Sequence, residues 1–200
     1  MARAAASAVL EDVERILAKV APAAPRSPSA SGGALVVLVG LPGSGKSTVA
    51  EELRARTGCV VLESDALRRL LIERPAYSST ESRRLFEAIH EAVASLLAGG
   101  VSVVLDATNV AESERAPLYD LAGRTGAKLV LVRVAAPERV IRHRLAARTK
   151  NGGGASAADE IVYERMRSRV EEIQRPYHLV DTSKEVGPVL DAIAKEMMGT

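Results

Sequence analysis

Short, largely apolar runs alternate along the chain with longer stretches whose apolar residues recur at helical spacing. The short runs are typical of strands buried on both faces of a sheet. They lie at 35–39, which is unbroken, and at 59–62, 101–105 and 129–134, and we expect a last strand at 178–181. The longer stretches predict helices at 46–56, from 65 to before 75, and at 80–98, 113–122, 137–148, 159–174 and 188–198. Strands separated by helices imply parallel crossovers, so we expect an α/β fold with a parallel sheet covered by helices.

The N-terminal region differs from the rest of the chain. Its apolar residues recur at helical spacing between polar ones and predict an amphipathic helix; they are Val9, Leu10, Val13, Ile16, Leu17 and Val20. Residues 21–33 are rich in Ala, Pro, Ser and Gly, which is typical of a linker. The chain therefore divides into an N-terminal helix with a linker (1–33) and a main domain (34–200). We favour a helix that packs back on the domain, because apolar stripes usually face a core; the alternative is that it docks a partner or a second copy of the chain.

Composition narrows the class of protein. The chain has 200 residues, of which 47% are hydrophobic and 26% charged, as in a water-soluble domain of ordinary size. Aromatic residues make up only 2%, so the core must rest on Leu, Val, Ile and Ala. A net charge of +2 disfavours a protein that binds nucleic acid over its whole surface. With one cysteine, Cys59, and no apolar run of membrane-spanning length, we expect a cytoplasmic protein without an intramolecular disulfide, a cysteine-based zinc site or a membrane segment.

The most specific motif follows the first predicted strand. Residues Gly40–Ser47 read GLPGSGKS, which matches the G-x-x-x-x-G-K-[ST] loop that wraps a phosphate chain. Its glycines allow backbone N–H groups to approach the phosphates, and the N-terminus of the next helix adds a positive dipole. Lys46 would reach the β- and γ-phosphates, and Ser47 would ligate Mg²⁺. The predicted ATP-binding residues are Gly40, Pro42, Gly43, Ser44, Gly45, Lys46, Ser47 and Thr48.

Asp65 and Arg68 follow the second predicted strand. Ligands on a parallel sheet bind beyond the carboxyl ends of the strands, so Asp65 lies where a hydroxyl acceptor would approach the γ-phosphate. Its carboxylate could orient that hydroxyl and take its proton. Arg68 lies one helical turn further on the same face and could hold an anionic acceptor. The alternative is that Asp65 only caps a helix, an interpretation that the neighbouring phosphate-binding motif disfavours.

Asp106 ends the third predicted strand. Apolar residues followed directly by Asp, here Val103–Leu105 and Asp106, are typical of a strand whose carboxylate helps to hold Mg²⁺. Thr108 and Asn109 come next and could contact the acceptor or a phosphate. A capped turn also favours Asp, Thr and Asn, but the place of Asp106 directly after a buried strand favours a metal-binding role.

A basic segment follows the fourth predicted strand. Arg144 and Arg148 lie four residues apart on one face of the predicted helix and precede the Gly-rich residues 151–154. A phosphoryl transition state needs positive charge over its equatorial oxygens, so we predict that both arginines act from a mobile lid at about 149–158. Arg142 is more simply explained as part of a solvated basic face.

Together these motifs resemble the polynucleotide-kinase-type branch of the P-loop kinases. The resemblance rests on GLPGSGKST, ESDALRR, DATNVAESER and RHRLAAR and spans about residues 34–182. It implies a three-layer P-loop NTPase fold with a five-stranded parallel sheet in the order 2-3-1-4-5. It also implies roles for the residues named above: ATP and Mg²⁺ handling for Lys46 and Ser47, the general base for Asp65, acceptor contact for Arg68, and action from the lid for Arg144 and Arg148.

We therefore expect an ATP-dependent phosphotransferase that moves the γ-phosphate of ATP to a hydroxyl acceptor. The resemblance favours the 5′-hydroxyl end of a polynucleotide as that acceptor. The nearly neutral charge and the scarcity of aromatic rings for base stacking leave a small metabolite open, and kinases for adenylyl sulfate and gluconate share the same parts. An alternative of a different class is a nucleotide-dependent switch or ATPase module that docks through its N-terminal helix.

Overall fold

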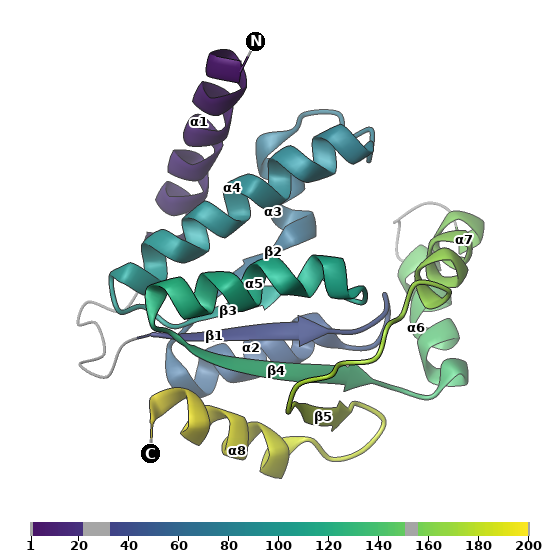
Figure 1. Cartoon of the computed structure of the whole chain (residues 1–200). Coiled ribbons are helices and arrows are strands. Elements are labelled where there is room, and N and C mark those ends of the chain that lie inside the picture. The colour runs from purple at the N-terminus through teal and green to yellow at the C-terminus, as the bar shows by residue number, and fades with distance from the viewer. Residues whose placement is uncertain (1, 22–32, 151–155, 200) are drawn as a thin grey trace.

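The computed structural model describes residues 2–21, 33–150 and 156–199, with side chains for 6–21, 33–147 and 161–199. Its centre is a five-stranded parallel sheet in the order β2-β3-β1-β4-β5 (Figure 1). The strands are β1 Ala34–Val39, β2 Val60–Glu63, β3 Val103–Asp106, β4 Lys128–Ala135 and β5 His178–Asp181. The predicted α/β fold and strand order are confirmed.

Helices cover both faces of this sheet and complete three layers (Figure 1). The helices of the described chain are α1 Ala2–Val20, α2 Lys46–Thr57, α3 Ser64–Leu71, α4 Ser79–Ala98, α5 Glu112–Thr125, α6 Glu138–Lys150, α7 Ser156–Arg167 and α8 Gly187–Met198. Helices α4 and α5 lie on one face, and α2 and α8 lie on the other. Because side chains alternate along a strand, Val37 joins the core under α4 and α5 and Val36 joins the core under α2 and α8. No helix in the described ranges is long and apolar enough to cross a membrane.

The N-terminal helix α1 packs on the domain through its apolar stripe. Val13 and Ile16 are buried in the core that α4 covers, while Leu10 is 60% exposed. The buried carboxylate of Asp12 accepts a hydrogen bond from Arg84 of α4 at 2.7 Å. The favoured interpretation, a helix that packs back on the domain, is therefore confirmed, and self-association through it stays a prediction.

The segment after α7 differs from the sequence-based expectation. The helix predicted over 159–174 ends at Arg167, and the chain beyond it lacks regular structure up to β5. The backbone N–H of Glu171 donates to the Val110 carbonyl at 3.0 Å, and the side chain of Ile173 is buried in the core. The predicted boundary is wrong because contacts with a distant loop, which helical spacing cannot reveal, hold this segment in place.

Arg115 on α5 fastens that segment to the loop after β3. Its side chain is 0% exposed and is the largest fully buried one in the described part of the chain. Glu112 balances its charge through an ion pair at 2.9 Å. At distances of 2.8–3.4 Å the guanidinium donates to four backbone carbonyls, those of Asn109, Val110, Glu171 and Glu172. One buried cation therefore joins two loops that lie far apart in the sequence.

Replacing Ile16 with Ala tests whether α1 belongs to the cooperative fold. Because this side chain is fully buried, we expect the free energy of unfolding to fall by about 3 kcal/mol. Leu10→Ala, on an exposed position of the same helix, should change it by less than about 0.5 kcal/mol. Urea unfolding followed by circular dichroism measures both, and equal effects would contradict the packing of α1 on the core.

Arg115→Met tests the link between the two loops. The substitution leaves buried carbonyls without their donor, so the free energy of unfolding should fall by about 3–5 kcal/mol. Arg124→Met, at an exposed position of the same helix, is the matched control and should stay within about 0.5 kcal/mol of the parent protein. If both variants unfold at the same urea concentration, the link does not contribute to the free energy of unfolding.

Candidate active site

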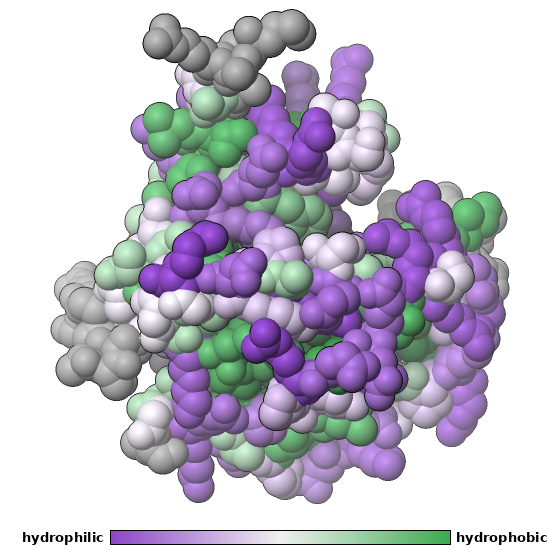
Figure 2. Space-filling view, in the orientation of Figure 1, coloured by the Kyte–Doolittle hydropathy of each residue, from purple (hydrophilic) through white to green (hydrophobic). Residues whose placement is uncertain are grey.

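The carboxyl ends of the strands meet at one edge of the sheet, beside α6 and α7 (Figure 1). Strands β2 and β3 pair in parallel up to Glu63 and Asp106, which lie opposite each other. The phosphate-binding loop follows β1, between β3 and β4 in the sheet. The structure therefore brings this loop, Asp65 and Asp106 to the same edge, as expected for a parallel sheet. Figure 2 shows largely hydrophilic side chains on the projection formed by α6 and α7, which borders this edge.

Glycines let the phosphate-binding loop fold tightly against its neighbours. Gly43 and Gly45 have φ angles of 78° and 99°, in the left-handed region that favours glycine. A Cβ on Gly40 would lie 2.4 Å from the carbonyl oxygen of Val134, so a larger residue cannot fit there without a shift of backbone. The backbone N–H of Gly40 donates to the Thr108 carbonyl at 2.9 Å, which ties the loop to the chain just after β3.

The loop and the first turn of α2 fit the phosphates of a nucleotide. No described side chain caps α2, so the N–H groups and positive dipole of its first turn are available to an anion. Ser47 and Thr48 are exposed in this turn, and Nζ of Lys46 donates to the Leu41 carbonyl at 3.0 Å. The buried hydroxyl of Ser44 has no hydrogen-bond partner among the described residues. These groups belong to the binding residues predicted from the motif, and their contact with ATP stays a prediction.

Asp106, the carboxylate predicted to help hold Mg²⁺, lies at the same edge of the sheet as the phosphate-binding loop. It is buried at the end of β3, one strand away from the phosphate-binding loop. Mg²⁺ in nucleotide sites usually takes one or two protein ligands and completes its shell with water and phosphate oxygens. Ser47 and Asp106 are the residues that would hold Mg²⁺ together with ATP. The described residues contain no group of three or more His, Cys, Asp or Glu side chains that could hold an ion.

Asp65 lies in the first turn of α3 and is exposed. The N-cap residue of this helix is Glu63, so the alternative in which Asp65 only caps the helix is wrong. Within the described part of the chain, its carboxylate has no hydrogen-bond donor. It is therefore available to a hydroxyl that approaches the edge of the sheet.

Arg68, one turn further along α3, is held by the start of α4. Its guanidinium pairs with Glu81, donates to the Ser82 hydroxyl at 3.3 Å and lies 4.9 Å from the centre of the Tyr77 ring. Partial burial would raise the pKa of Glu81, but hydrogen bonds from the Ala76 backbone and from Arg68 outweigh it and hold that pKa below its ordinary value. The Arg68 side chain is buried, and its Nε has no hydrogen-bond partner among the described residues.

Asn109 is turned into the protein rather than toward a ligand. Its Nδ2 is buried and donates to the Leu38 carbonyl at 2.9 Å. Its φ of 47° is a left-handed conformation that Asn tolerates better than most residues. The expectation that Asn109 contacts the acceptor or a phosphate is therefore wrong, because its amide braces the turn after β3 against β1.

Arg144 reaches from α6 to the phosphate-binding loop. Its Nη1 donates to Oγ1 of Thr182 at 2.7 Å and to the Gly43 and Ser44 carbonyls at 3.4 Å. Its Nη2 donates to the Thr182 carbonyl at 2.9 Å. The Cγ2 of Thr182 would lie 3.0 Å from a Cβ on Gly45. Sequence reasoning missed Thr182, for which the only signal was its position directly after a strand.

The remaining lid residues are only partly described. Residues 151–155 of the predicted lid at 149–158, and the side chains of Arg148 and of the whole lid, lie outside the described residues. Arg142 forms ion pairs with Glu138 at 2.8 Å and with Glu164 at 2.5 Å. This half-exposed pairing between α6 and α7 agrees with the interpretation of Arg142 as part of a solvated face.

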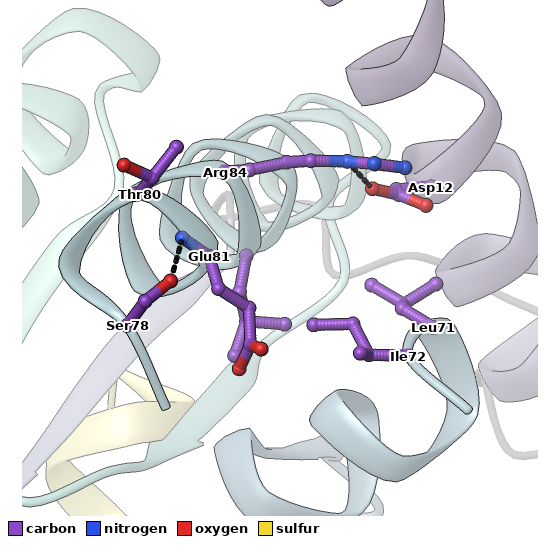
Figure 3. A pocket seen from close by; sticks show the side chains of 8 residues that line it. Asp12, Leu71, Ile72, Ser78, Thr80, Glu81 and Arg84 are labelled. Atoms are coloured by element: carbon purple, nitrogen blue, oxygen red, sulfur yellow. Dashed lines mark hydrogen bonds and ion pairs between the residues drawn. The ribbon is translucent and has the colours of Figure 1, made fainter. Parts of the chain in front are cut away.

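A separate cavity lies between α1, the end of α3 and the start of α4 (Figure 3). Its volume is about 360 Å³, and its lining residues are Asp12, Leu71, Ile72, Ser78, Thr80, Glu81, Arg84 and Leu85. The ion pair between Asp12 and Arg84 bridges α1 and α4 beside it. No residue of the phosphate-binding loop lines this cavity, so it is not the nucleotide site.

Several solved structures share this architecture. The APS kinase CysC of Mycobacterium tuberculosis, in complex with AMPPNP and APS, is 19% identical and has a TM-score of 0.65, covering 87% of this chain and 100% of that one. Kti12 of Chaetomium thermophilum, in complex with ADP-AlF3, is 23% identical with a TM-score of 0.63 over 82% and 98% of the two chains. A gluconokinase of Sinorhizobium meliloti 1021 is 21% identical with a TM-score of 0.55 over 84% and 90%. At these identities the similarity establishes the fold alone.

A comparison with curated proteins found no match. The family model described as "AAA domain" matches residues 35–173. This match covers more than half of the chain and includes the phosphate-binding loop, Asp65, Asp106 and Arg144. The chain therefore belongs to the AAA domain family.

Proposed function

We propose that this protein is an ATP-dependent phosphotransferase that moves the γ-phosphate of ATP to a hydroxyl acceptor. The observation that carries the proposal is an exposed carboxylate, Asp65, at the same sheet edge as the phosphate-binding loop. A nucleotide-binding loop by itself serves many functions, whereas transfer to a hydroxyl needs a nearby base as well.

Binding of ATP would rest on the loop backbone and the start of α2. Lys46 would leave the Leu41 carbonyl and move its ammonium to the β- and γ-phosphates. Ser47 and Asp106 would hold Mg²⁺, which neutralises charge on the phosphate oxygens. The N–H groups of the first turn of α2 would complete the cradle.

In the transfer step, the carboxylate of Asp65 accepts the proton of the acceptor hydroxyl. The hydroxyl oxygen forms a bond to the γ-phosphorus as the bond to the β–γ bridging oxygen breaks, so the products are ADP and a phosphate ester. Arg144 and Arg148 would supply positive charge to the transferred group. Arg144 already contacts the loop carbonyls of Gly43 and Ser44, and Arg148 lies one helical turn away, about 6 Å along α6.

A small hydroxyl metabolite is the acceptor class that we favour. Among the solved proteins with this fold are kinases named for adenylyl sulfate and for gluconate. A net charge of +2 supplies no general attraction for a polynucleotide backbone. The 5′-hydroxyl end of a polynucleotide and a nucleotide-dependent switch are the alternatives that the experiment below must separate. A cytoplasmic location stays an expectation.

Asp65→Asn tests the proposed base. It should lower phosphate transfer by about 10²–10⁴-fold because the amide cannot accept the hydroxyl proton. Its Kd for ATP should stay within about twofold of that of the parent protein, because Asp65 does not contact ATP in this proposal. Transfer of label from γ-labelled ATP to a panel of metabolites and 5′-hydroxyl oligonucleotides measures the first quantity, and isothermal titration calorimetry measures the second.

Glu73→Gln, an exposed acidic residue just after α3, is the control for loss of a nearby charge. Unchanged transfer by Asp65→Asn would remove Asp65 from the mechanism. Hydrolysis of ATP without label on any acceptor would instead favour the switch, and label on the oligonucleotide would favour the polynucleotide acceptor.

Arg144→Met tests the arginine that contacts the loop. Loss of its charge should lower kcat by about 10²–10³-fold, as for other groups that stabilise a charged transition state. Arg139→Met, at an exposed position of the same helix, should retain kcat within about twofold. Steady-state kinetics at saturating ATP measure both, and equal kcat values for the two variants would exclude the proposed role of Arg144.

A further inference from the structure

Tyr77, in the loop between α3 and α4, is an unusual residue in this chain. The sequence contains one Phe, four Tyr and no Trp. Tyr119 and Tyr163 are buried, whereas the Tyr77 side chain is 66% exposed. An aromatic ring offers a large surface for contact at a small cost in side-chain entropy, so an exposed ring in the loop that follows the helix of Asp65 is informative.

The backbone at Tyr77 is held in an unfavourable conformation. Its φ is 53°, in the left-handed region that bulky residues rarely occupy. The carboxylate of Glu81 accepts hydrogen bonds from the N–H of Ala76 at 2.7 Å and from that of Tyr77 at 3.3 Å. Conformations of this kind cluster at functional sites, where surrounding contacts keep them in place.

The Tyr77 ring also makes a cation–π contact with a buried arginine. The guanidinium of Arg68 lies 4.9 Å from the ring centre, and Glu81 balances its charge. Arg68 follows Asp65 by three residues on α3, so the ring lies over a side chain of the helix that carries the proposed base. The Arg68 side chain is buried. An exposed ring therefore lies on a buried, neutralised guanidinium one helical turn beyond Asp65.

We infer that Tyr77 is a specificity-determining residue that stacks on a ring of the acceptor, a sugar or a nucleoside. This inference rests on the proposed function, because it concerns the acceptor of that reaction. A nucleoside base presents a planar face to tyrosine and a sugar ring presents its C–H face, whereas an acyclic polyol has no ring to stack. Glu81 already neutralises Arg68 beneath the ring, so an uncharged ring is a sufficient partner for Tyr77.

Three variants test the inference. Tyr77→Asn removes the ring but keeps a residue that tolerates a positive φ, and Tyr77→Phe keeps the ring. Tyr177→Asn removes the other exposed tyrosine, which is 39% exposed, and is the matched control. Binding of adenosine, glucose and the acyclic sorbitol is measured by calorimetry with AMPPNP and Mg²⁺ present, so that the nucleotide site is filled.

We expect adenosine or glucose, and not sorbitol, to bind the parent protein. Tyr77→Asn should raise the Kd of the bound ring compound about tenfold, in line with stacking on an aromatic side chain. Tyr77→Phe and Tyr177→Asn should change it by less than about twofold. If adenosine binds, the acceptor ring is that of a nucleoside, and if glucose binds, it is that of a sugar. For a phosphorylated acceptor, KM should rise by the same factor in Tyr77→Asn while the KM for ATP is unchanged.

The inference is overturned if neither ring compound binds, if sorbitol binds equally well, or if Tyr77→Asn binds as tightly as the parent protein. A lower Tm of Tyr77→Asn without a change in Kd would show that Tyr77 is only structural. The experiment distinguishes failure of this inference from failure of the proposed function. Tyr77-dependent binding without phosphate transfer would refute the proposed function and keep the stacking contact. Phosphate transfer with an unchanged acceptor KM in Tyr77→Asn would refute the stacking contact and keep the proposed function.

Discussion

The pairing of β1 with both β3 and β4 is the constraint on which the rest of the structure depends. Val36 lies in register with Val104 on one side and with Val130 on the other, and all three strands are parallel. The chain that leaves β1 must therefore pass between the ends of its two neighbours. The Thr108 carbonyl then binds the Gly40 N–H, and the Val134 carbonyl excludes any Cβ at Gly40. The need for glycine at position 40 is thus a consequence of the sheet itself.

Two arginines hold the loops at the carboxyl edge of the sheet together by donating hydrogen bonds to backbone carbonyls. Arg144 joins α6 to the phosphate-binding loop and to Thr182 after β5. Arg115 joins the loop after β3 to the segment after α7. Hydrogen bonds from charged donors are stronger than neutral ones, and a guanidinium can serve several carbonyls at once. Loops from four parts of the chain are therefore held together without forming further strands.

Helix α1 holds α3 and α4 through similar contacts from arginine side chains. Arg15 donates to the carbonyl oxygens of Leu70 and Leu71 at the end of α3, and Asp12 pairs with Arg84 of α4. A cation at the C-terminus of a helix satisfies carbonyls that lack an intrahelical partner. Helix α3, which carries Asp65 and Arg68, is consequently fixed at its far end by the N-terminal helix. The position of the proposed base thus depends on residues that precede the AAA domain match.

The sequence by itself determined the strands, most of the helices, the fold family and the phosphate-binding loop. Each is encoded by local spacing, namely short apolar runs, helical periodicity and glycines at fixed intervals. Only the tertiary structure decided the end of α7, the buried position of Arg115 and the inward turn of Asn109. It also decided that Glu81 balances Arg68. Each of these depends on a partner far away in the sequence, and the spacing of residues along a chain carries no signal for which distant carbonyl or carboxylate a side chain will meet.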